Sequence, residues 1–534
     1  MAIRVSNLRL PLGEPEAAVP TYLARLLGVP AERFASWRIL RKSLDARKKH
    51  AFHFVYTAEV RLADDEAAIA MRASKRHPLV RIELHEEPAF RLPPAGSAPL
   101  KHRPVVVGSG PGGLVAAYFL AEQGFAPILL ERGPAVRERI HDVKTFDQGG
   151  AFQPESNYLF GEGGAGTFSD GKLTCRTSGP ETRRVLELFA ECKGKPSIVY
   201  DYRPHLGSNR LPAVVKAIRR RIEAMGGEVR FNTRVEDLDM SPDGVRGVMT
   251  SSGFVAADVV ILAIGHSARD TIQMLVRRGV PIVAKPFQMG VRIEQPQETV
   301  NRVKYGSDRL EDQLGAADYN LIAKGPHDLF SFCMCAGGHV IPSVSDEGYF
   351  CSNGMSLSKH DSPFANSGLV VTIPIEHFPG DDVLAGMRLQ EQYEKRAFEL
   401  GRGEYRCPIQ RASDFLQGRK STSEPPSSYP RGLVLADLTE VMPLIVRETL
   451  MHGLPILNHR WQGRFLAEAT LVGPEARGSS PIRMLRDPLS RQAPGIAGLF
   501  PVGEGAGYAG GIVSAAVDGL KTAAAIIAQF QAVS

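Results

Sequence analysis

Hydrophobic and polar residues follow two patterns along the chain, one typical of strands and one typical of helices. In residues 1–90, β-branched and aromatic residues recur at alternate positions in IRVSNLRL and HAFHFVYTAEVRL, which predicts strands. The stretches EPEAAVPTYLARLLG and DDEAAIAMRASK begin with acidic residues and end with basic ones, the order that a helix dipole favours. Residues 1–95 are therefore predicted to form a small α+β domain, and RLPPAGSAPLKHRP is predicted to be a linker.

From residue 104 the predicted elements are a strand, a turn, a helix and a second strand. Helix and strand patterns alternate again over residues 205–285. Such alternation predicts an α/β fold with a parallel sheet. Residues 286–490 contain both helix and strand patterns, so we expect a mixed α+β domain there that serves as a substrate or cap domain. The final segment, 491–534, has an apolar run, a glycine cluster and an alanine-rich helical pattern.

The strongest motif lies in RPVVVGSGPGGLVAAYFLAEQGFAPILLERG, residues 103–133, where Gly108, Gly110 and Gly113 have the spacing G-x-G-x-x-G. An apolar strand pattern precedes the glycines, an apolar helix pattern follows, and a second strand pattern ends at Glu131, 18 residues beyond Gly113. This order is the fingerprint of a dinucleotide-binding βαβ unit. The glycines allow a tight turn and close approach of a pyrophosphate, which the helix N-terminus attracts.

The acidic residue that ends the second strand selects the nucleotide. A carboxylate accepts hydrogen bonds from ribose hydroxyl groups and repels a 2′-phosphate, so we expect FAD or NAD rather than NADP at this site. The residues predicted to bind the dinucleotide here are Gly108, Ser109, Gly110, Pro111, Gly112, Gly113, Glu131 and Arg132.

Two further stretches share the glycine spacing. GEGGAG, residues 161–166, has no apolar strand pattern before it, and GAGYAG, residues 505–510, is followed by too little chain for a second strand and acid. We therefore expect one complete nucleotide-binding fold, and no dedicated domain for NAD(P)H, which stays open as a transient electron donor.

The late glycine cluster in LFPVGEGAGYAGGIVSAAVDGL, residues 499–520, favours FAD. It resembles the chain end of flavoenzymes of the glutathione-reductase type, in which a strand ending in an acid and a following helix cover the flavin half. A helix beginning near 510–512 would stabilise the negative charge of a reduced flavin. The alternative is a glycine turn needed for packing alone. The predicted flavin-binding residues are Gly503, Glu504, Gly510, Gly511 and Ile512.

The whole chain resembles a bacterial family of uncharacterised FAD-dependent dehydrogenases related to the glutathione-reductase superfamily. The resemblance is specific in NYLFGEGGAGTFSDGKL, SFCMCAGGHVIPS, SNGMSLSKHDSPFANSGLVV, GSSPIRMLRD and GEGAGYAGGIVSAAVDG. It implies a Rossmann-like FAD-binding domain over residues 104–285 that is completed by 491–534, with non-covalent FAD, and it supplies no substrate. By the same resemblance, Gly163, Gly164, Gly166, Ser169, Val235 and Gly265 are expected to contact the cofactor.

Several polar residues are candidates for chemistry beside the flavin. Asp170 and Lys172 follow the glycines of residues 161–166, and His339 is a further weak candidate for proton transfer, although a lone histidine is more often structural. The pair Cys333 and Cys335 raises a redox question, since flavins can pass electrons to a disulfide, but the strained ring of a C-x-C disulfide and the apolar surroundings favour two buried structural thiols. Pairing with acidic residues at the surface is the interpretation for Arg477, Arg483 and Arg486.

Composition narrows the possible classes of function. The chain has 534 residues and a net charge of +6, which is too mild to indicate nucleic-acid binding by itself. Its six cysteines form no C-x2-C pair, so we expect reduced thiols, a cytoplasmic protein and no metal site. No signal peptide or membrane span is expected. The basic cluster RKSLDARKKH, residues 41–50, is interpreted as a strand edge or domain contact.

These patterns predict a cytoplasmic, dehydrogenase-like FAD-dependent oxidoreductase that transfers a hydride or two electrons on a small molecule. One alternative is a flavin-dependent RNA-modifying enzyme with residues 1–90 as its RNA-binding module. Others are a flavin monooxygenase and a non-catalytic scaffold stabilised by FAD. The sequence leaves the substrate, the electron acceptor and the oligomeric state open.

Overall fold

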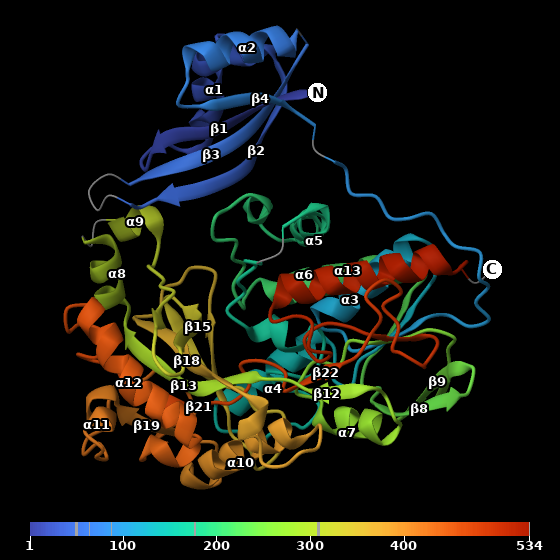
Figure 1. Ribbon diagram of the computed structural model, residues 1–534, viewed down its shortest axis with the longest axis vertical. Coiled ribbons are helices and arrows are strands. Elements are labelled where there is room, and N and C mark those ends of the chain that lie inside the picture. Colours follow the sequence, from blue (N-terminus) through green and yellow to red (C-terminus); the bar gives the residue numbers. More distant parts are fainter. Residues whose placement is uncertain (48–51, 64, 87, 176–177, 307–309, 533–534) are drawn as a thin grey trace.

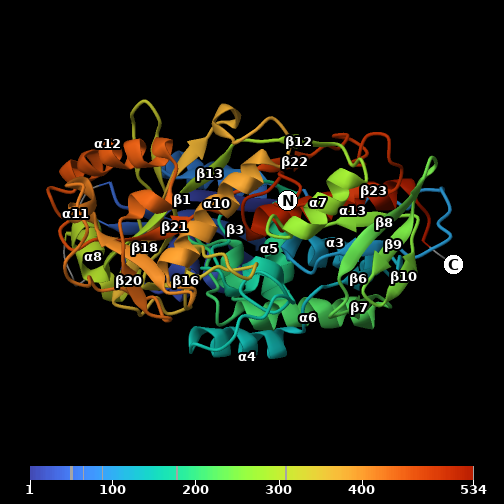
Figure 2. The ribbon, with the colours of Figure 1, turned by 90° about the horizontal axis from the view of Figure 1, so that it is seen from below.

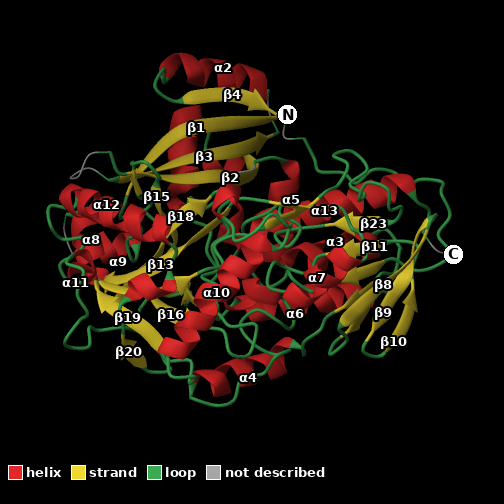
Figure 3. Ribbon diagram, turned by 60° about the horizontal axis from the view of Figure 1, so that its bottom comes forward, coloured by secondary structure: helices red, strands yellow, loops and turns green. Residues whose placement is uncertain are grey.

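A computed structural model describes residues 1–47, 52–63, 65–86, 88–175, 178–306 and 310–532. The N-terminal part is an antiparallel sheet with strand order β2-β3-β1-β4, whose apolar face packs on two helices (Figures 1 and 3). Asp65 caps the second helix by accepting hydrogen bonds from the backbone N–H groups of Ala67 and Ala68. The elements are β1 (Ala2–Pro11), α1 (Val19–Leu27), β2 (Phe34–Asp45), β3 (His53–Leu62), α2 (Glu66–Arg76) and β4 (Arg81–His85).

The basic cluster lies at the end of β2, where the N-terminal sheet meets the rest of the chain. Lys42 forms an ion pair with Glu16 at 2.7 Å, and its backbone N–H donates to the carbonyl oxygen of Tyr200 at 2.7 Å. The Tyr200 hydroxyl donates to the second oxygen of Glu16. This part of the cluster is a contact between domains, and residues 48–50 of the cluster lie outside the described residues.

The part of the chain that contains the G-x-G-x-x-G motif is built on a parallel sheet with the order β23-β11-β5-β6-β7. Its central strands are buried apolar runs, as expected for a sheet covered on both faces. On one face the strands pack on α3, α5, α6 and α13, and on the other face on a small antiparallel sheet and α7. The strands are β5 (Val105–Val107), β6 (Ile128–Leu130), β7 (Glu228–Arg230), β8 (Val235–Ser241), β9 (Gly244–Thr250), β10 (Gly253–Ala256), β11 (Val260–Leu262) and β23 (Leu499–Pro501).

The first and last helices of this part, α3 and α13, lie side by side although they are far apart in the sequence (Figure 1). They touch through backbone, because a Cβ added at Gly519 would lie 2.1 Å from the carbonyl oxygen of Gly112. The helices are α3 (Pro111–Glu122), α4 (Val136–Asp147), α5 (Pro180–Glu191), α6 (Leu211–Ala224), α7 (Arg269–Arg277) and α13 (Ile512–Gln529).

Helix α13 is, over the described part of the chain, the one helix long and apolar enough to cross a membrane. Its apolar side chains, among them Val517, Leu520 and Ile527, belong to the core beneath the parallel sheet. Burial within the protein accounts for its composition.

The mixed part is built on a seven-stranded sheet with the order β14-β15-β18-β13-β21-β19-β20. Strands β13 and β18 pair without a break from Phe287 opposite Ile373 to Pro296 opposite Phe364. This sheet and the β8-β9-β10 sheet lie at opposite ends of the molecule (Figure 2). The seven strands are β13 (Phe287–Pro296), β14 (Ile322–Ala323), β15 (Leu329–Cys335), β18 (Phe364–Ile373), β19 (Cys407–Arg411), β20 (Leu433–Leu435) and β21 (Thr470–Glu475).

Over the residues that the structure describes, five helices pack around the mixed part, and two pairs of short strands form separate small sheets. The helices are α8 (Gln297–Tyr305), α9 (Glu311–Leu314), α10 (Ala385–Leu400), α11 (Ala412–Leu416) and α12 (Leu444–Arg460). The pairs are β12 (Ile282–Ala284) with β22 (Ile482–Met484) and β16 (Gly338–Pro342) with β17 (Ser352–Ser356).

Candidate cofactor and active site

A cavity of about 840 Å³ lies between the carboxyl ends of the parallel strands and the seven-stranded sheet, a size typical of ligand sites. One end is lined by backbone from three glycine-rich segments, and the other by side chains from β15, its neighbours and the loop after residue 168. The lining includes residues 107–112, 130–132, 164–166, 169–172, 233–235, 263–268, 318–320, 330–334, 502–504 and 510–512.

The first glycine turn follows β5. Gly108 has a φ of +98°, and a Cβ at Gly113 would lie 1.9 Å from the Gly108 carbonyl oxygen, so side chains are excluded from both positions. A Cβ at Gly110 would meet no protein atom within 4 Å and would project into open space. Gly110 precedes α3, whose N-terminal N–H groups therefore lie at the cavity with room for a ligand.

Glu131 has more partners than its predicted role requires. Its carboxylate accepts hydrogen bonds from the backbone N–H and hydroxyl of Ser109 at 2.9 and 2.6 Å, and from the backbone N–H groups of Gly133 and Gly161 at 3.0 and 3.1 Å. These four donors match the lone-pair positions of a carboxylate. Glu131 thus joins the first glycine turn to the 161–166 segment, and a ribose hydroxyl group at the cavity would share an oxygen that already has partners.

Arg132 is also held by the protein. Its guanidinium lies 4.1 Å from the centre of the Phe160 ring and pairs with Glu155 and Asp270 at 2.5 and 2.9 Å. The pKa of Arg132 rises because these two carboxylates outweigh its burial. A bound nucleotide would meet a guanidinium whose charge is already neutralised.

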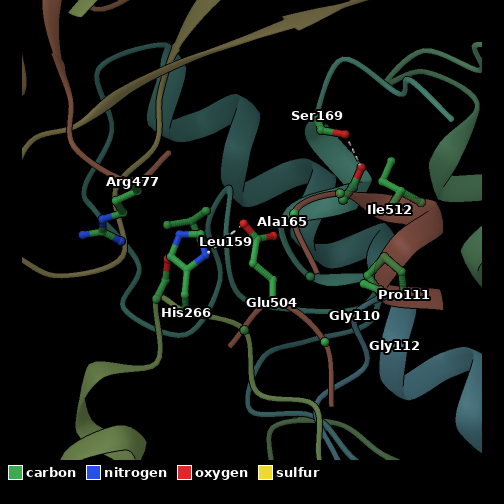
Figure 4. A pocket seen from close by; sticks show the side chains of 18 of the residues that line it. Gly110, Pro111, Gly112, Leu159, Ala165, Ser169, His266, Arg477, Glu504 and Ile512 are labelled. Atoms are coloured by element: carbon green, nitrogen blue, oxygen red, sulfur yellow. Dashed lines mark hydrogen bonds and ion pairs between the residues drawn. The ribbon is translucent and has the colours of Figure 1, made fainter. Parts of the chain in front are cut away.

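The second glycine-rich segment folds as a 3-10 turn, Gly164–Phe168, without a strand before it. A Cβ at Gly164 would lie 3.1 Å from Cα of Gly110, so the two segments touch through backbone. The Ser169 hydroxyl donates to the Gly166 carbonyl oxygen at 2.8 Å (Figure 4). Gly163 serves the turn, because its Cβ would meet the Thr167 hydroxyl at 2.0 Å.

The third segment follows β23 and leads into α13, which begins at Ile512. The backbone N–H of Gly503 donates to Asp518 at 2.8 Å, and a Cβ at Gly510 would meet no protein atom within 4 Å. Glu504 and His266 face each other across the cavity wall at 3.4 Å (Figure 4). Gly510 and Gly511 therefore leave space at the N-terminus of an eighteen-residue helix.

The structure brings nearly all the predicted cofactor-binding residues to one cavity. Gly113 and Gly163 are not among the lining residues: Gly113 packs against the backbone of Gly108, and Gly163 leaves room for the side chains of Thr167 and Val215. Val235 and Gly265 contribute to the wall beside the first glycine turn.

Asp170 and Lys172 lie at the other end of the cavity as an ion pair with 3.3 Å between Nζ and Oδ2. Burial opposes the charge on Asp170, but Lys172, His205 and a 2.5 Å hydrogen bond from Ser356 lower its pKa overall. The same ion pair raises the pKa of Lys172 despite burial. Lys172 is therefore a permanent cation and not a proton acceptor at neutral pH. His339 lies on β16 opposite Met355, outside the cavity lining.

A buried arginine behind this end was missed by the sequence analysis. Arg292 on β13 is fully buried and pairs with Glu475 at 2.8 Å. It also donates to the side-chain oxygens of Asn353 and Asn366, each at 2.9 Å, and to the carbonyl oxygen of Cys333 at 2.8 Å. Burial raises the pKa of Glu475 to about 7 although Arg292 opposes this. A charged residue inside the apolar pattern of FQMGVRIEQP was the available signal.

Two interpretations of the sequence need correction. Cys333 is half-buried and lines the cavity, so it is not a buried structural thiol, whereas Cys335 is buried behind it. Arg477 is buried, not at the surface, and makes a two-pronged contact with Glu394 at 2.7 and 2.8 Å. Arg486 is likewise nearly buried in its pair with Asp518. The charged partners in these two pairs come from segments far apart in the sequence, including α10 and α13.

Comparison with family models agrees with the geometry. A model described as FAD-dependent protein, C-terminal domain-like, matches residues 286–478, and one described as FAD dependent oxidoreductase matches 183–319. A model of an NAD(P)-binding Rossmann-like domain matches residues 106–164, and a domain of unknown function matches 2–61.

Known proteins are similar to different extents. An uncharacterised protein of Clostridium beijerinckii is 39% identical over 99% of both chains. Monomeric sarcosine oxidase of a Bacillus species is 25% identical over 38% of this chain and 60% of its own. Among solved structures, glycine oxidase from Bacillus cereus is 13% identical with a TM-score of 0.34, covering 80% of this chain and 95% of its own. The chain belongs to a family of FAD-dependent oxidoreductases that includes the C. beijerinckii protein.

Proposed function

We propose that this oxidoreductase binds FAD non-covalently in the 840 Å³ cavity and oxidises a small molecule at the end formed by β15 and the Asp170–Lys172 pair. The observation that carries the proposal is the continuity of the cavity from the glycine turns to this polar end. The N-termini of α3 and α13 both open onto the cavity, and the open space at Gly110 and Gly510 fits a group that approaches the backbone closely.

The bound FAD supplies two-electron chemistry, and the protein supplies orientation and electrostatics. The N–H groups at the start of α3 favour the diphosphate, and those at the start of α13 favour negative charge on a reduced ring. Lys172 presents a permanent positive charge beside a substrate, so it stabilises an anionic group but does not remove a proton.

The strand order β23-β11-β5-β6-β7, with the β8-β9-β10 sheet on one face, supports a glutathione-reductase type of nucleotide-binding domain as part of this proposal. Cys192, Cys333, Cys335, Cys351 and Cys407 are free thiols, which supports a reducing compartment such as the cytoplasm. Neither alternative, an RNA-modifying enzyme or a monooxygenase, is favoured by the family matches.

The similarity to monomeric sarcosine oxidase makes amino acids the first substrates to test. The purified yellow protein is mixed anaerobically with single amino acids, hydroxy acids, NADH and NADPH, and the flavin absorbance near 450 nm is followed. Bleaching by one compound, weakened in a Lys172→Met variant that still holds FAD, is the expected result. A protein that is colourless and does not take up added FAD would contradict the proposal.

A further inference from the structure

Two thiols on β15 lie at the polar end of the cavity. The pairing of β15 with β18 shifts register between Phe332 and Cys335, and Cys333 within this irregularity has a φ of +43°. Such bulges redirect side chains beside functional sites, and a positive φ at a non-glycine residue marks strain that the surroundings maintain. The irregularity places Cys333 on the cavity wall and Cys335 in the interior directly behind it.

The two cysteines are close together, and their pKa values are shifted in opposite directions. Cys335 Sγ lies 3.3 Å from the Cys333 carbonyl oxygen, so its side chain folds back along the strand toward Cys333. The hydrogen bond from the Cys335 thiol, helped by Lys172 and Arg292 and opposed by burial and Asp170, lowers the pKa of Cys333 below its usual value. Burial, and the role of donor to Cys333, raise the pKa of Cys335 well above its usual value. A thiolate beside a protonated thiol is the arrangement of a nucleophilic and a resolving cysteine.

The charged groups around the pair explain why one thiolate is stable there. Arg292 is fully buried, with a guanidinium nitrogen 3.8 Å from Cys335 Sγ, and Lys172 faces Cys333 from the adjoining loop. Asp170 and Glu475 oppose a negative charge at Cys333, but Asp170 is paired with Lys172, and Glu475 has a pKa of about 7 and is partly protonated at neutral pH. Two fixed cations thus face one fixed carboxylate.

Other buried cysteines of the chain lack this environment. Burial raises the pKa of Cys351 to about 12 and that of Cys407 well above its usual value. Neither lines the cavity. The low pKa therefore does not follow from burial in this fold, but from the neighbours that Cys333 has at the cavity.

We propose that Cys333 and Cys335 form a second redox centre, a dithiol that exchanges two electrons with the FAD of the same cavity. The proposal rests on the proposed function, because it needs FAD in this cavity. One S–S bond forms between the two sulfurs as the S–H bond of Cys335 breaks. The electron pair reduces FAD to FADH2, which takes up the proton from Cys335 and one proton from solvent. The reverse step restores the dithiol and oxidised FAD.

An anaerobic titration of the purified holoenzyme with dithionite tests the second centre. The oxidised wild-type protein is expected to consume two equivalents of this two-electron reductant per FAD before reduction is complete. Cys335→Ser and Cys333→Ser are each expected to consume one. The matched control is Cys192→Ala, a buried thiol in another core, which is expected to keep the wild-type uptake.

Counting thiols in denaturant gives a readout independent of FAD spectra. The oxidised wild-type holoenzyme is expected to have two fewer reactive thiols than the dithionite-reduced protein, and the difference is expected to vanish in Cys335→Ser. The wild-type count requires no variant to fold. A holoenzyme that takes up one equivalent and has equal thiol counts in both states would overturn the dithiol while leaving the proposed function intact. A protein without FAD would contradict the proposed function itself.

Discussion

The two ends of the cavity are built in opposite ways. At the glycine end, three segments remove side chains so that backbone approaches backbone, as at Gly113 and Gly164. At the polar end, Arg292, Glu475 and Asp170 are buried charges brought together from β13, β21 and a loop. The glycine end therefore depends on positions without side chains, and the polar end depends on contacts between segments that are far apart in the sequence. Substitutions at the polar end are therefore expected to change mainly the stability of the fold. At the glycine end, some substitutions are expected to change FAD affinity without changing stability.

The largest effect is expected from breaking the buried pair at the polar end. Arg292→Leu leaves Glu475, whose pKa is already about 7, buried without its partner. It also removes the donor to Asn353, Asn366 and the Cys333 carbonyl oxygen, and such losses together typically cost about 3–5 kcal/mol. The measurement is the free energy of unfolding from urea titration. The double variant with Glu475→Leu is expected to recover much of this loss because neither charge then remains alone. A loss below about 1 kcal/mol in the single variant would mean that water reaches the pair.

The next largest effect is a pH dependence at the same end. Burial lowers the pKa of His205 to about 4, and its side chain lies against the Asp170 carbonyl oxygen at 2.5 Å. As the pH decreases, His205 takes up a proton near pH 6.5 in the unfolded chain but only near pH 4 in the folded protein. The free energy of unfolding therefore falls between these two pH values, by at most about 3 kcal/mol.

The measurement is the difference in unfolding free energy between the wild type and His205→Gln across this pH range. The opposite contribution of Glu475 is common to both proteins and cancels in the difference. A difference that is independent of pH would show that His205 is protonated as easily in the folded protein as in the unfolded chain.

At the glycine end, Gly113→Ala is expected to destabilise the protein with or without FAD. The added Cβ would lie 1.9 Å from the Gly108 carbonyl oxygen, and overpacking of this kind costs about 1–3 kcal/mol. The thermal midpoint of the FAD-free protein measures it. An unchanged midpoint would show that the turn relaxes freely.

The smallest effect on stability is expected for Gly110→Ala, three residues earlier in the sequence. Its Cβ would meet no protein atom within 4 Å. The unfolding free energy of the FAD-free variant is therefore expected to lie within about 0.5 kcal/mol of the wild-type value. Its FAD affinity, measured by fluorescence quenching, is expected to fall at least about tenfold, or 1.4 kcal/mol. Equal affinity would mean that FAD does not approach this turn.

Local order in the sequence was enough to predict the family and the glycine end. The spacing of Gly108, Gly110 and Gly113, with flanking strand and helix patterns, lies within about thirty residues, so its consequences are local. A family of FAD-dependent oxidoreductases, predicted from these motifs, is confirmed by the family matches, whereas the relation to the glutathione-reductase superfamily stays a prediction.

The polar end could not be predicted because its contacts join remote strands. Arg292 and Glu475 are adjacent only after β13 pairs with β21. The C-x-C segment was interpreted as two buried structural thiols, but the register shift against β18 leaves Cys333 on the cavity wall and Cys335 in the interior. For Glu131, the motif predicted a residue that lines the cavity but not the hydrogen bonds that its carboxylate accepts from the protein, such as the one from the backbone N–H of Gly161.

The contact of Gly519 with Gly112 has a consequence for biosynthesis. Strand β23 and helix α13 are synthesised long after the first βαβ unit, yet they complete the sheet and the wall that this unit begins. The nascent chain must therefore wait, with its first glycine turn exposed, until both elements have left the ribosome. Truncation just before β23 is expected to leave an otherwise long polypeptide unable to retain its coenzyme.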